Sequence, residues 1–200
     1  MKSKFEPQIL GSLCLIGLAI SSISPNDYLT WVLEVFPILL GVPILIVTYK
    51  WFHFSQAAYR LMFIHAIILM IGGHYTYAQV PFGFWMQEVF DFSRNHYDRI
   101  GHFAQGLVPA FLAREVLIRT SPLKRGGWVR FLPVAVAMFI SALYEIIEWQ
   151  SAVILGSSAD AFLGSQGDIW DTQWDMAMAL IGSSLTVILP LGWHKVEEEN

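Results

Sequence analysis

Six long apolar stretches, separated by short loops, constrain the fold of this sequence more than any other feature. They cover about residues 8–23, 28–49, 57–78, 97–118, 131–155 and 172–193. A membrane-spanning helix needs about 20 mainly apolar residues, and lipid leaves no partner for an open strand edge or a loose loop. The sequence therefore predicts an all-α polytopic transmembrane helical bundle of about six spans, with residues 1–200 forming a single integral membrane domain.

The composition agrees with a membrane environment. Of the 200 residues, 55% are hydrophobic and 14% are charged, whereas soluble domains carry roughly 25% charged residues. The formal net charge of −4 argues against a nucleic-acid partner, and membrane lipid is the expected surrounding. Cys14, the only cysteine, lies within the first stretch, so no intrachain disulfide can form.

The lysine and arginine residues indicate how the bundle is oriented, because such residues are retained in cytoplasmic loops. Of the twelve, only Arg94 and Arg99 fall on the other side of a six-span arrangement. Since no convincing small-x-small cleavage site follows the first stretch, we expect it to remain as a span. These observations predict a multi-pass protein with its N-terminus and C-terminus in the cytoplasm.

The two longest loops on the expected outer side differ in composition. Residues 81–92 are rich in phenylalanine and also contain a tryptophan, and such rings are favoured at the membrane interface. Residues 156–171 are rich in glycine and serine, which predicts irregular backbone.

Histidine and carboxylate residues gather at the expected outer ends of four helices. Pairs spaced four residues apart, such as Asp98 with His102, project from one face of a helix. An ionisable side chain at this depth costs on the order of 2.5 kcal/mol or more unless it is paired, so such groups normally face the bundle interior. The sequence therefore predicts one shared polar site. Its expected members are His74, Asp98, His102, Glu145, Glu148, Asp171 and Asp175.

Some of these residues also have a purely structural explanation. A carboxylate in the first turn of a helix is stabilised by the helix dipole, which would account for Asp98 and Asp171. His74, taken alone, is more often an interfacial histidine. Glu145 and Glu148 lie at the C-terminal end of their helix, where the dipole disfavours anions, so capping does not explain them. Glu34 is a secondary candidate, and the histidines interpreted as structural or interfacial are His53, His65, His96 and His194.

Four segments carry a resemblance to a known family: HYTYAQVPFG from His74, NHYDRIGHFAQG from Asn95, ALYEIIEWQ from Ala142 and GDIWDTQWDM from Gly167. Over most of its length the sequence resembles the YjdF type of bacterial inner-membrane protein. The resemblance implies a location in the bacterial cell inner membrane and a site at these residues, but it names no reaction.

A more remote similarity is to the VanZ-like family, whose pattern is an Asp and a His four apart, then Glu-x-x-Gln, then a helix opening with Asp-x-x-x-Asn. Asp98 and His102 match the first element, and Asp171 begins the third. Asp175 stands where that family has Asn, and Glu145 is followed by Glu148 in place of Gln. The site is therefore more anionic than the family pattern. Members of that family are linked to glycopeptide resistance, which points to the cell envelope.

Three functions are compatible with this pattern. The first is metal-dependent processing of a lipid-linked envelope substrate, or of a small molecule, at the outer leaflet. Its divalent ion would be Zn²⁺, Mn²⁺ or Mg²⁺. The second is a structural or binding protein whose polar cluster locks helix packing, and the third is a proton- or ion-coupled transporter.

Under the first hypothesis, two overlapping sets of residues carry the chemistry. Without a metal, Glu145 and Glu148 could divide the general acid and base roles. The expected catalytic residues are Glu145, Glu148, Asp98 and His102, and the expected metal ligands are His74, His102, Asp98, Glu145, Asp171 and Asp175.

Overall fold

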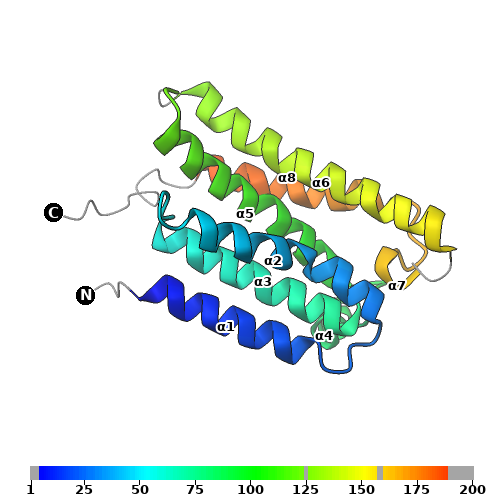
Figure 1. Ribbon diagram of the computed structural model, residues 1–200. Coiled ribbons are helices and arrows are strands. Elements are labelled where there is room, and N and C mark those ends of the chain that lie inside the picture. The colour runs from blue at the N-terminus through cyan, green and yellow to red at the C-terminus, as the bar shows by residue number, and fades with distance from the viewer. Residues whose placement is uncertain (1–4, 124–125, 157–159, 189–200) are drawn as a thin grey trace.

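The computed structural model describes residues 5–123, 126–156 and 160–188, and within them the regular structure is helical. Six long helices lie side by side as a bundle (Figure 1). They are α1 (Glu6–Ser21), α2 (Tyr28–Thr48), α3 (Gln56–Tyr75), α5 (Tyr97–Thr120), α6 (Gly127–Leu155) and α8 (Asp171–Ile188). Three short elements, η1 (Tyr77–Gln79), α4 (Pro81–Phe90) and α7 (Asp160–Leu163), connect them. The predicted all-α bundle is confirmed.

The six helices correspond to the six predicted spans, with shifted ends. Helices α2, α3 and α6 are long and apolar enough to cross a membrane, and α1 is apolar but shorter. Helices α5 and α8 are less apolar because they carry the charged residues of the bundle interior. The third span ends at Tyr75 rather than 78, since Thr76 adopts a φ of 59° and turns the chain into η1. Residues 189–193 of the sixth predicted span lie outside the described residues.

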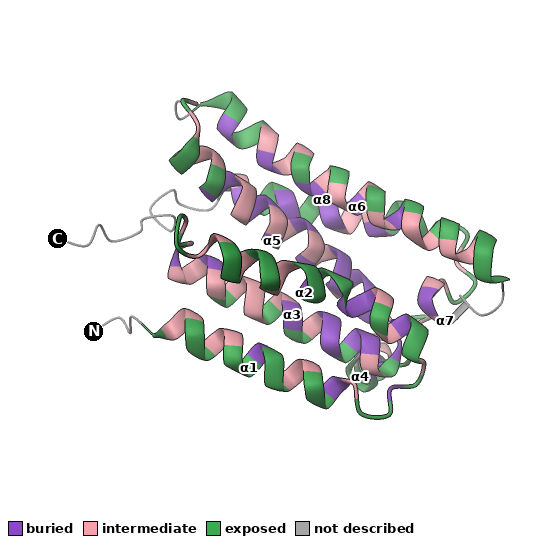
Figure 2. Ribbon diagram, in the orientation of Figure 1, coloured by how far each residue is buried: buried purple, intermediate pink, exposed green. Residues whose placement is uncertain are grey.

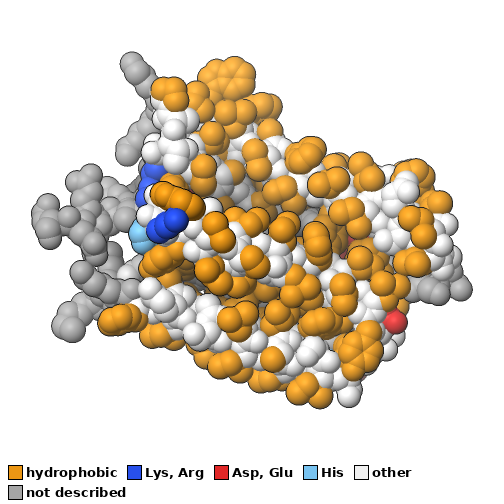
Figure 3. All heavy atoms as spheres, viewed as in Figure 1, with side chains coloured by type: hydrophobic (Ala, Val, Ile, Leu, Met, Phe, Trp, Pro, Cys, Tyr) orange, Lys and Arg blue, Asp and Glu red, His pale blue; other side chains and the backbone are white. Residues whose placement is uncertain are grey.

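The surface of the bundle is apolar along the helices, with basic side chains at one end. Hydrophobic side chains cover most of the face in Figure 3, and the lysine and arginine side chains visible there lie at the end where α1 begins. Large side chains on α2 and α6 are among the exposed ones, including Phe36, Ile46, Phe139 and Trp149. In α4, expected to lie at the interface, Phe82, Phe84, Trp85 and Phe90 are likewise exposed. This surface suits lipid.

Helix α5 lies in the middle of the bundle and packs against α3, α6 and most extensively against α8 (Figure 2). Glycines allow the contact with α8: a Cβ atom at Gly106 would overlap the backbone of Ala179, and one at Gly182 would overlap the carbonyl group of Phe103. Small residues permit such close approach of membrane helices. This approach brings the polar first turns of α5 and α8 together.

A buried carboxylate ties the other end of α5 to α3. Glu115 accepts hydrogen bonds from the Ser55 amide and hydroxyl, each at 2.7 Å, and from Arg119 Nη1 at 2.8 Å. Ser55 is also the N-cap of α3, where its hydroxyl accepts from the Ala58 amide. Both oxygens of this carboxylate therefore have partners.

Valine at position 182 should destabilise the bundle, because its side chain must push α8 away from the Phe103 carbonyl. Such overpacking costs about 1–3 kcal/mol, and the unfolding midpoint falls by roughly 2–4 °C per kcal/mol for a chain of this size. Thermal unfolding in detergent measures the effect. Gly11→Val is the matched control, since a Cβ there meets nothing within 4 Å. Equal midpoints for the two variants would contradict the close packing of α5 and α8.

Candidate functional site

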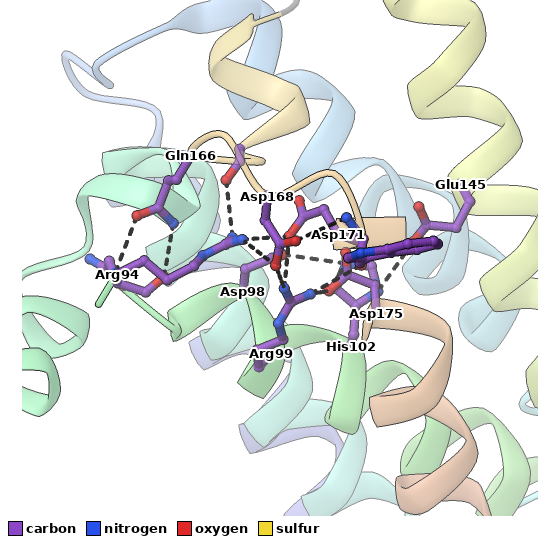
Figure 4. A network of polar contacts seen from close by, with 12 residues as sticks. Arg94, Asp98, Arg99, His102, Glu145, Gln166, Asp168, Asp171 and Asp175 are labelled. Carbon is purple, nitrogen blue, oxygen red and sulfur yellow. Dashed lines mark hydrogen bonds and ion pairs between the residues drawn. The ribbon is translucent and has the colours of Figure 1, made fainter. Parts of the chain in front are cut away.

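His102, on the second turn of α5, lies at the centre of a buried cluster of carboxylates (Figure 4). The residue is 7% exposed, and its two ring nitrogen atoms face different partners. Nε2 lies 3.3 Å from Asp98 Oδ1 and 3.8 Å from Asp175 Oδ1. Nδ1 lies 3.0 Å from Gln105 Oε1 and 3.8 Å from Glu145 Oε1. The imidazole therefore separates the cluster into two halves.

Each half can supply three metal-ligand atoms that lie within 4.8 Å of one another. One group is Asp98, His102 and Asp175, and the other is His102, Glu145 and Glu148. The first group comes from α5 and α8, whereas the second joins α5 to α6. The same distance limit holds for both groups, so the cationic partners of their carboxylates are needed to distinguish them.

Two arginines occupy the half that faces the loop before α8. Arg99 Nη2 donates to Asp171 Oδ1 at 2.8 Å and to Asp168 Oδ2 at 3.3 Å, and its Nη1 donates to Asp175 Oδ1. Arg94 Nη1 reaches the same two loop-side carboxylates, at 2.8 Å for Asp171 and 3.3 Å for Asp168. Asp168, Asp171 and Asp175 therefore already have cationic partners.

The loop between α7 and α8 is held onto the start of α5 by further contacts. Gln166 pairs with the backbone of Asn95, accepting from its amide at 3.1 Å and donating to its carbonyl at 2.8 Å. Arg94 Nη2 also donates to the Gly164 carbonyl at 3.4 Å. Gly164, Gln166 and Gly167 all have positive φ, which agrees with the irregular backbone predicted here.

The other half of the cluster contains buried polar atoms that make no hydrogen bond. Oε1 of Glu145 is buried and accepts no hydrogen bond, although the whole residue is 7% exposed. The hydroxyl of Ser141, one turn earlier on α6, is also buried without a hydrogen bond. Burying an unpaired carboxylate is costly, and such atoms in native structures often mark a missing ligand or water. Glu115, with both oxygens satisfied, provides the contrast.

A small cavity extends the site toward the middle of the bundle. It has a volume of about 100 Å³, and its polar lining includes Glu34, His65, Gln105 and Glu148 beside His102. At about 30 Å³ per water molecule, it has room for about three waters or a small polar group. Nε2 of His65 is buried in this lining and has no hydrogen-bond partner.

The structure brings together most of the residues predicted to share a site. Asp98, His102, Glu145, Glu148 and Asp175 all belong to the two candidate metal groups. Glu34, the secondary candidate, lines the adjoining cavity.

Two predicted metal ligands lie elsewhere. Asp171 belongs to neither group, and its Oδ1 accepts from both Arg94 and Arg99. The structure places His74 apart from the cluster: its Nδ1 lies 3.0 Å from the Ser21 carbonyl oxygen on α1. Met70, four residues earlier, packs against Gly17 of α1, so His74 follows the face of α3 that is turned to α1.

Sequence reasoning missed several residues of the site, among them Arg94, Arg99, Asp168 and His65. The sequence did contain a signal for the arginines. Among the lysine and arginine residues, Arg94 and Arg99 are the two that fall on the expected outer side of the bundle. Arg94, just before α5, and Arg99, in its first turn, serve here as partners for carboxylates of α8. His65 was interpreted as structural, and nothing in the local sequence places it beside a cavity.

Comparisons with known proteins agree with this architecture. Residues 7–196 match the family described as "Predicted membrane protein (DUF2238)". The chain belongs to this family. It is also 48% identical over 197 residues to the inner membrane protein YjdF of Escherichia coli (strain K12), which covers 97% of this chain and 94% of that protein. No solved structure matches.

Family membership confirms the resemblance to the YjdF type. The protein is an integral membrane protein, and its relative in Escherichia coli is a protein of the inner membrane. These findings do not support the more remote VanZ-like similarity, which stays a prediction from the sequence.

Replacing Arg99 with glutamine should strongly destabilise the protein, because the carboxylates of Asp171 and Asp175 would lose a buried cation. Removing one partner of a buried ion pair costs about 3–5 kcal/mol. Thermal unfolding in detergent measures the loss. Arg60→Gln is the control: that side chain is 60% exposed, and its pair with Glu6 should contribute little. Equal effects of the two substitutions would show that the Arg99 pairs do not hold the site together.

Proposed function

We propose that the protein is a metal-dependent membrane enzyme that processes a lipid-linked substrate of the cell envelope, with His102, Glu145 and Glu148 as the metal ligands. The single observation that carries this proposal is the buried Oε1 atom of Glu145, which lies 3.8 Å from His102 Nδ1 and has no hydrogen-bond partner. A divalent cation between these atoms would supply the missing positive charge.

The environment of the carboxylates favours this group over Asp98, His102 and Asp175. Oδ1 of Asp175, the atom nearest His102 Nε2, already accepts a hydrogen bond from Arg99. A metal there would have to displace a guanidinium and would be repelled by its charge. No arginine or lysine is paired with Glu145 or Glu148 among the described ion pairs. A metal in the second group therefore displaces no cation.

The partners of His102 suit coordination through Nδ1. Asp98 Oδ1 lies 3.3 Å from Nε2 and can accept a hydrogen bond from the Nε2–H group. Histidines that bind metals usually donate their other ring N–H to a carboxylate or a carbonyl group, which fixes the tautomer. Nδ1 would then carry the free lone pair toward Glu145 and Glu148. Asp98 acts as a positioning residue in this arrangement, and the side-chain oxygen of Gln105 offers a further ligand atom.

One imidazole with two carboxylates fits Zn²⁺ or Mn²⁺ better than Mg²⁺, which prefers oxygen ligands and retains its waters. Ligand distances of about 2.0–2.2 Å keep ligand atoms within about 4.4 Å of one another, so this group needs only small adjustments. Such an ion can activate water or polarise a phosphoryl oxygen. The adjoining cavity would admit the reacting group.

The orientation of the protein supports an outer-leaflet substrate. The helix ends near the start of α1 carry positive residues: Lys50 follows α2, and Arg60, Arg119 and Arg130 lie near the ends of α3, α5 and α6. The His102 site, near the start of α5, is at the opposite end of the bundle (Figure 1). Because positive residues are retained in the cytoplasm, we infer that α1 begins on the cytoplasmic side. The site then faces the outer half of the membrane.

The two other functions account for less of the site. Locking of helix packing explains the arginine half, where each carboxylate has a cationic partner. It does not explain why Oε1 of Glu145 is buried without a hydrogen bond. A transporter needs a polar path across the whole bundle. Beyond His65, the space between the described helices continues as an apolar groove, which does not suit an ion.

Surface labelling tests the orientation. Ser93→Cys, in the exposed turn before α5, should react with a membrane-impermeant maleimide on intact cells with a permeabilised outer membrane, whereas His53→Cys should react only after lysis. Cys14 is buried and provides the unlabelled background. The reverse pattern, with His53→Cys labelled on intact cells, would place the site on the cytoplasmic side.

Metal analysis tests the ligand set. We expect the detergent-purified protein to bind Zn²⁺ or Mn²⁺, and Glu145→Gln and Glu148→Gln to lose binding while remaining folded, because an amide cannot replace a charged ligand. Asp98→Asn should weaken binding by roughly 10–100-fold, as changes to outer-shell partners do. Affinity is measured by competition with a chromophoric chelator, and folding by thermal unfolding.

Two variants serve as controls for this experiment. Glu88→Gln removes an exposed carboxylate on α4 and should leave the affinity unchanged. Asp175→Asn distinguishes the two candidate groups, because Asp175 is a ligand only in the group with Asp98 and His102, where it also pairs with Arg99. If Asp175→Asn abolished binding while Glu148→Gln retained it, the metal would belong to the other group. Absence of binding in the unmodified protein would overturn the proposal.

A further inference from the structure

A large apolar groove adjoins the small polar cavity beside His102. It has a volume of about 740 Å³ and is bounded mainly by α1, α2 and α3, with α5 and α6 at its inner wall. Ligand pockets typically measure about 300–1,000 Å³. The groove is therefore large enough to hold a ligand of substantial size.

The groove and the cavity share a wall. Pro37, His65, Leu69, Pro109 and Ile140 line both spaces, so the two meet about halfway along the bundle. From there the groove runs toward the end where α1 begins, and the cavity runs toward His102. A single elongated molecule could therefore occupy both.

The chemistry changes sharply along this path. The cavity is lined by Glu34, His65, Gln105 and Glu148, among others, and the unpaired Nε2 of His65 lies at the boundary. The groove is lined almost wholly by apolar residues, and its polar side chains near the far end, Gln8 and Tyr49, are hydrogen-bonded to each other at 3.1 Å. A ligand that matches both ends must have a small polar head and a long hydrocarbon tail.

We propose that the groove binds the hydrocarbon chain of a single-chain lipid alcohol or its phosphate ester, with the polar head in the cavity beside His65 and His102. This inference specifies the form of the lipid-linked substrate. It rests on the proposed function for the reaction that the substrate undergoes. The head would lie next to Glu148, on the side of the imidazole assigned to the metal. Since Glu34, Asp98 and Glu148 line the cavity, a phosphate head needs the metal to offset repulsion, whereas a hydroxyl head does not.

Photolabelling of the full-length protein in phosphatidylcholine nanodiscs tests the proposal. The probe is hexadecanol with a diazirine either near the hydroxyl or at the end of the chain. We expect the hydroxyl-end probe to label residues of the small cavity and the chain-end probe to label the groove near Gln8 and Tyr49. Excess unlabelled hexadecanol should remove both signals, and hexadecyl phosphate should compete only when Zn²⁺ or Mn²⁺ is present.

A substitution that fills the groove provides the decisive variant. Gly41 lines the groove, and a Cβ there meets nothing within 4 Å, so Gly41→Leu adds a side chain at an open position of the wall. Its labelling should fall by about tenfold or more, equivalent to about 1.4 kcal/mol of binding free energy. Gly127→Leu is the matched control, because that glycine is equally open but lies outside the groove. The control should label like the unmodified protein.

The outcomes separate this proposal from the metal site. Labelling by hexadecanol should persist in Glu145→Gln, so loss of metal alone leaves chain binding intact. Labelling spread over the exposed apolar face of α6, without competition and unchanged in Gly41→Leu, would mean that the groove holds only bulk lipid and would overturn the proposal. The reversed pattern, with the hydroxyl end near Gln8, would overturn it as well. Neither result would affect the metal measurements.

Discussion

Close contact between the backbones of α5 and α8, at Gly106 and Gly182, positions the polar site. Only at this separation does the Arg99 guanidinium reach the carboxylates of Asp171 and Asp175 on the neighbouring helix. In lipid an unpaired charge at this depth is expensive, so the pairing and the helix contact depend on each other. This explains why α5, which carries the central arginine and histidine, has half of its 24 residues buried.

The ring of His102 separates two halves of the polar cluster, one in which arginines pair with carboxylates and one in which we propose that a metal binds. On one side, arginines neutralise the carboxylates and hold a glycine-rich loop onto α5. On the other side, Oε1 of Glu145 is buried without a hydrogen bond, 3.8 Å from His102 Nδ1. The fold satisfies a buried glutamate elsewhere, since Glu115 has hydrogen bonds to both oxygens. The contrast between these two glutamates supports a ligand at Glu145.

Much of the fold and part of the site follow from the sequence. Apolar stretches of spanning length predict the six helices, and the i, i+4 spacing of Asp98 and His102 predicts a shared face. Depth along a helix does not reveal which neighbour a residue faces, and His74 therefore contacts α1 instead of the cluster. Arg94 and Arg99, which the sequence analysis used only to orient the bundle, form ion pairs with carboxylates of the site. The groove and the position of His65 depend on how α1, α2 and α3 pack around α5, which no local pattern encodes.

X-ray absorption spectroscopy of the zinc-loaded protein tests the central claim most directly, because it reports the atoms bound to the metal. The account predicts nitrogen and oxygen ligands at about 2.0–2.2 Å, with the outer-shell scattering of one imidazole that disappears in His102→Gln. A shell of oxygen atoms alone, or one containing two or more imidazoles, would contradict the assignment of His102, Glu145 and Glu148 as the metal ligands.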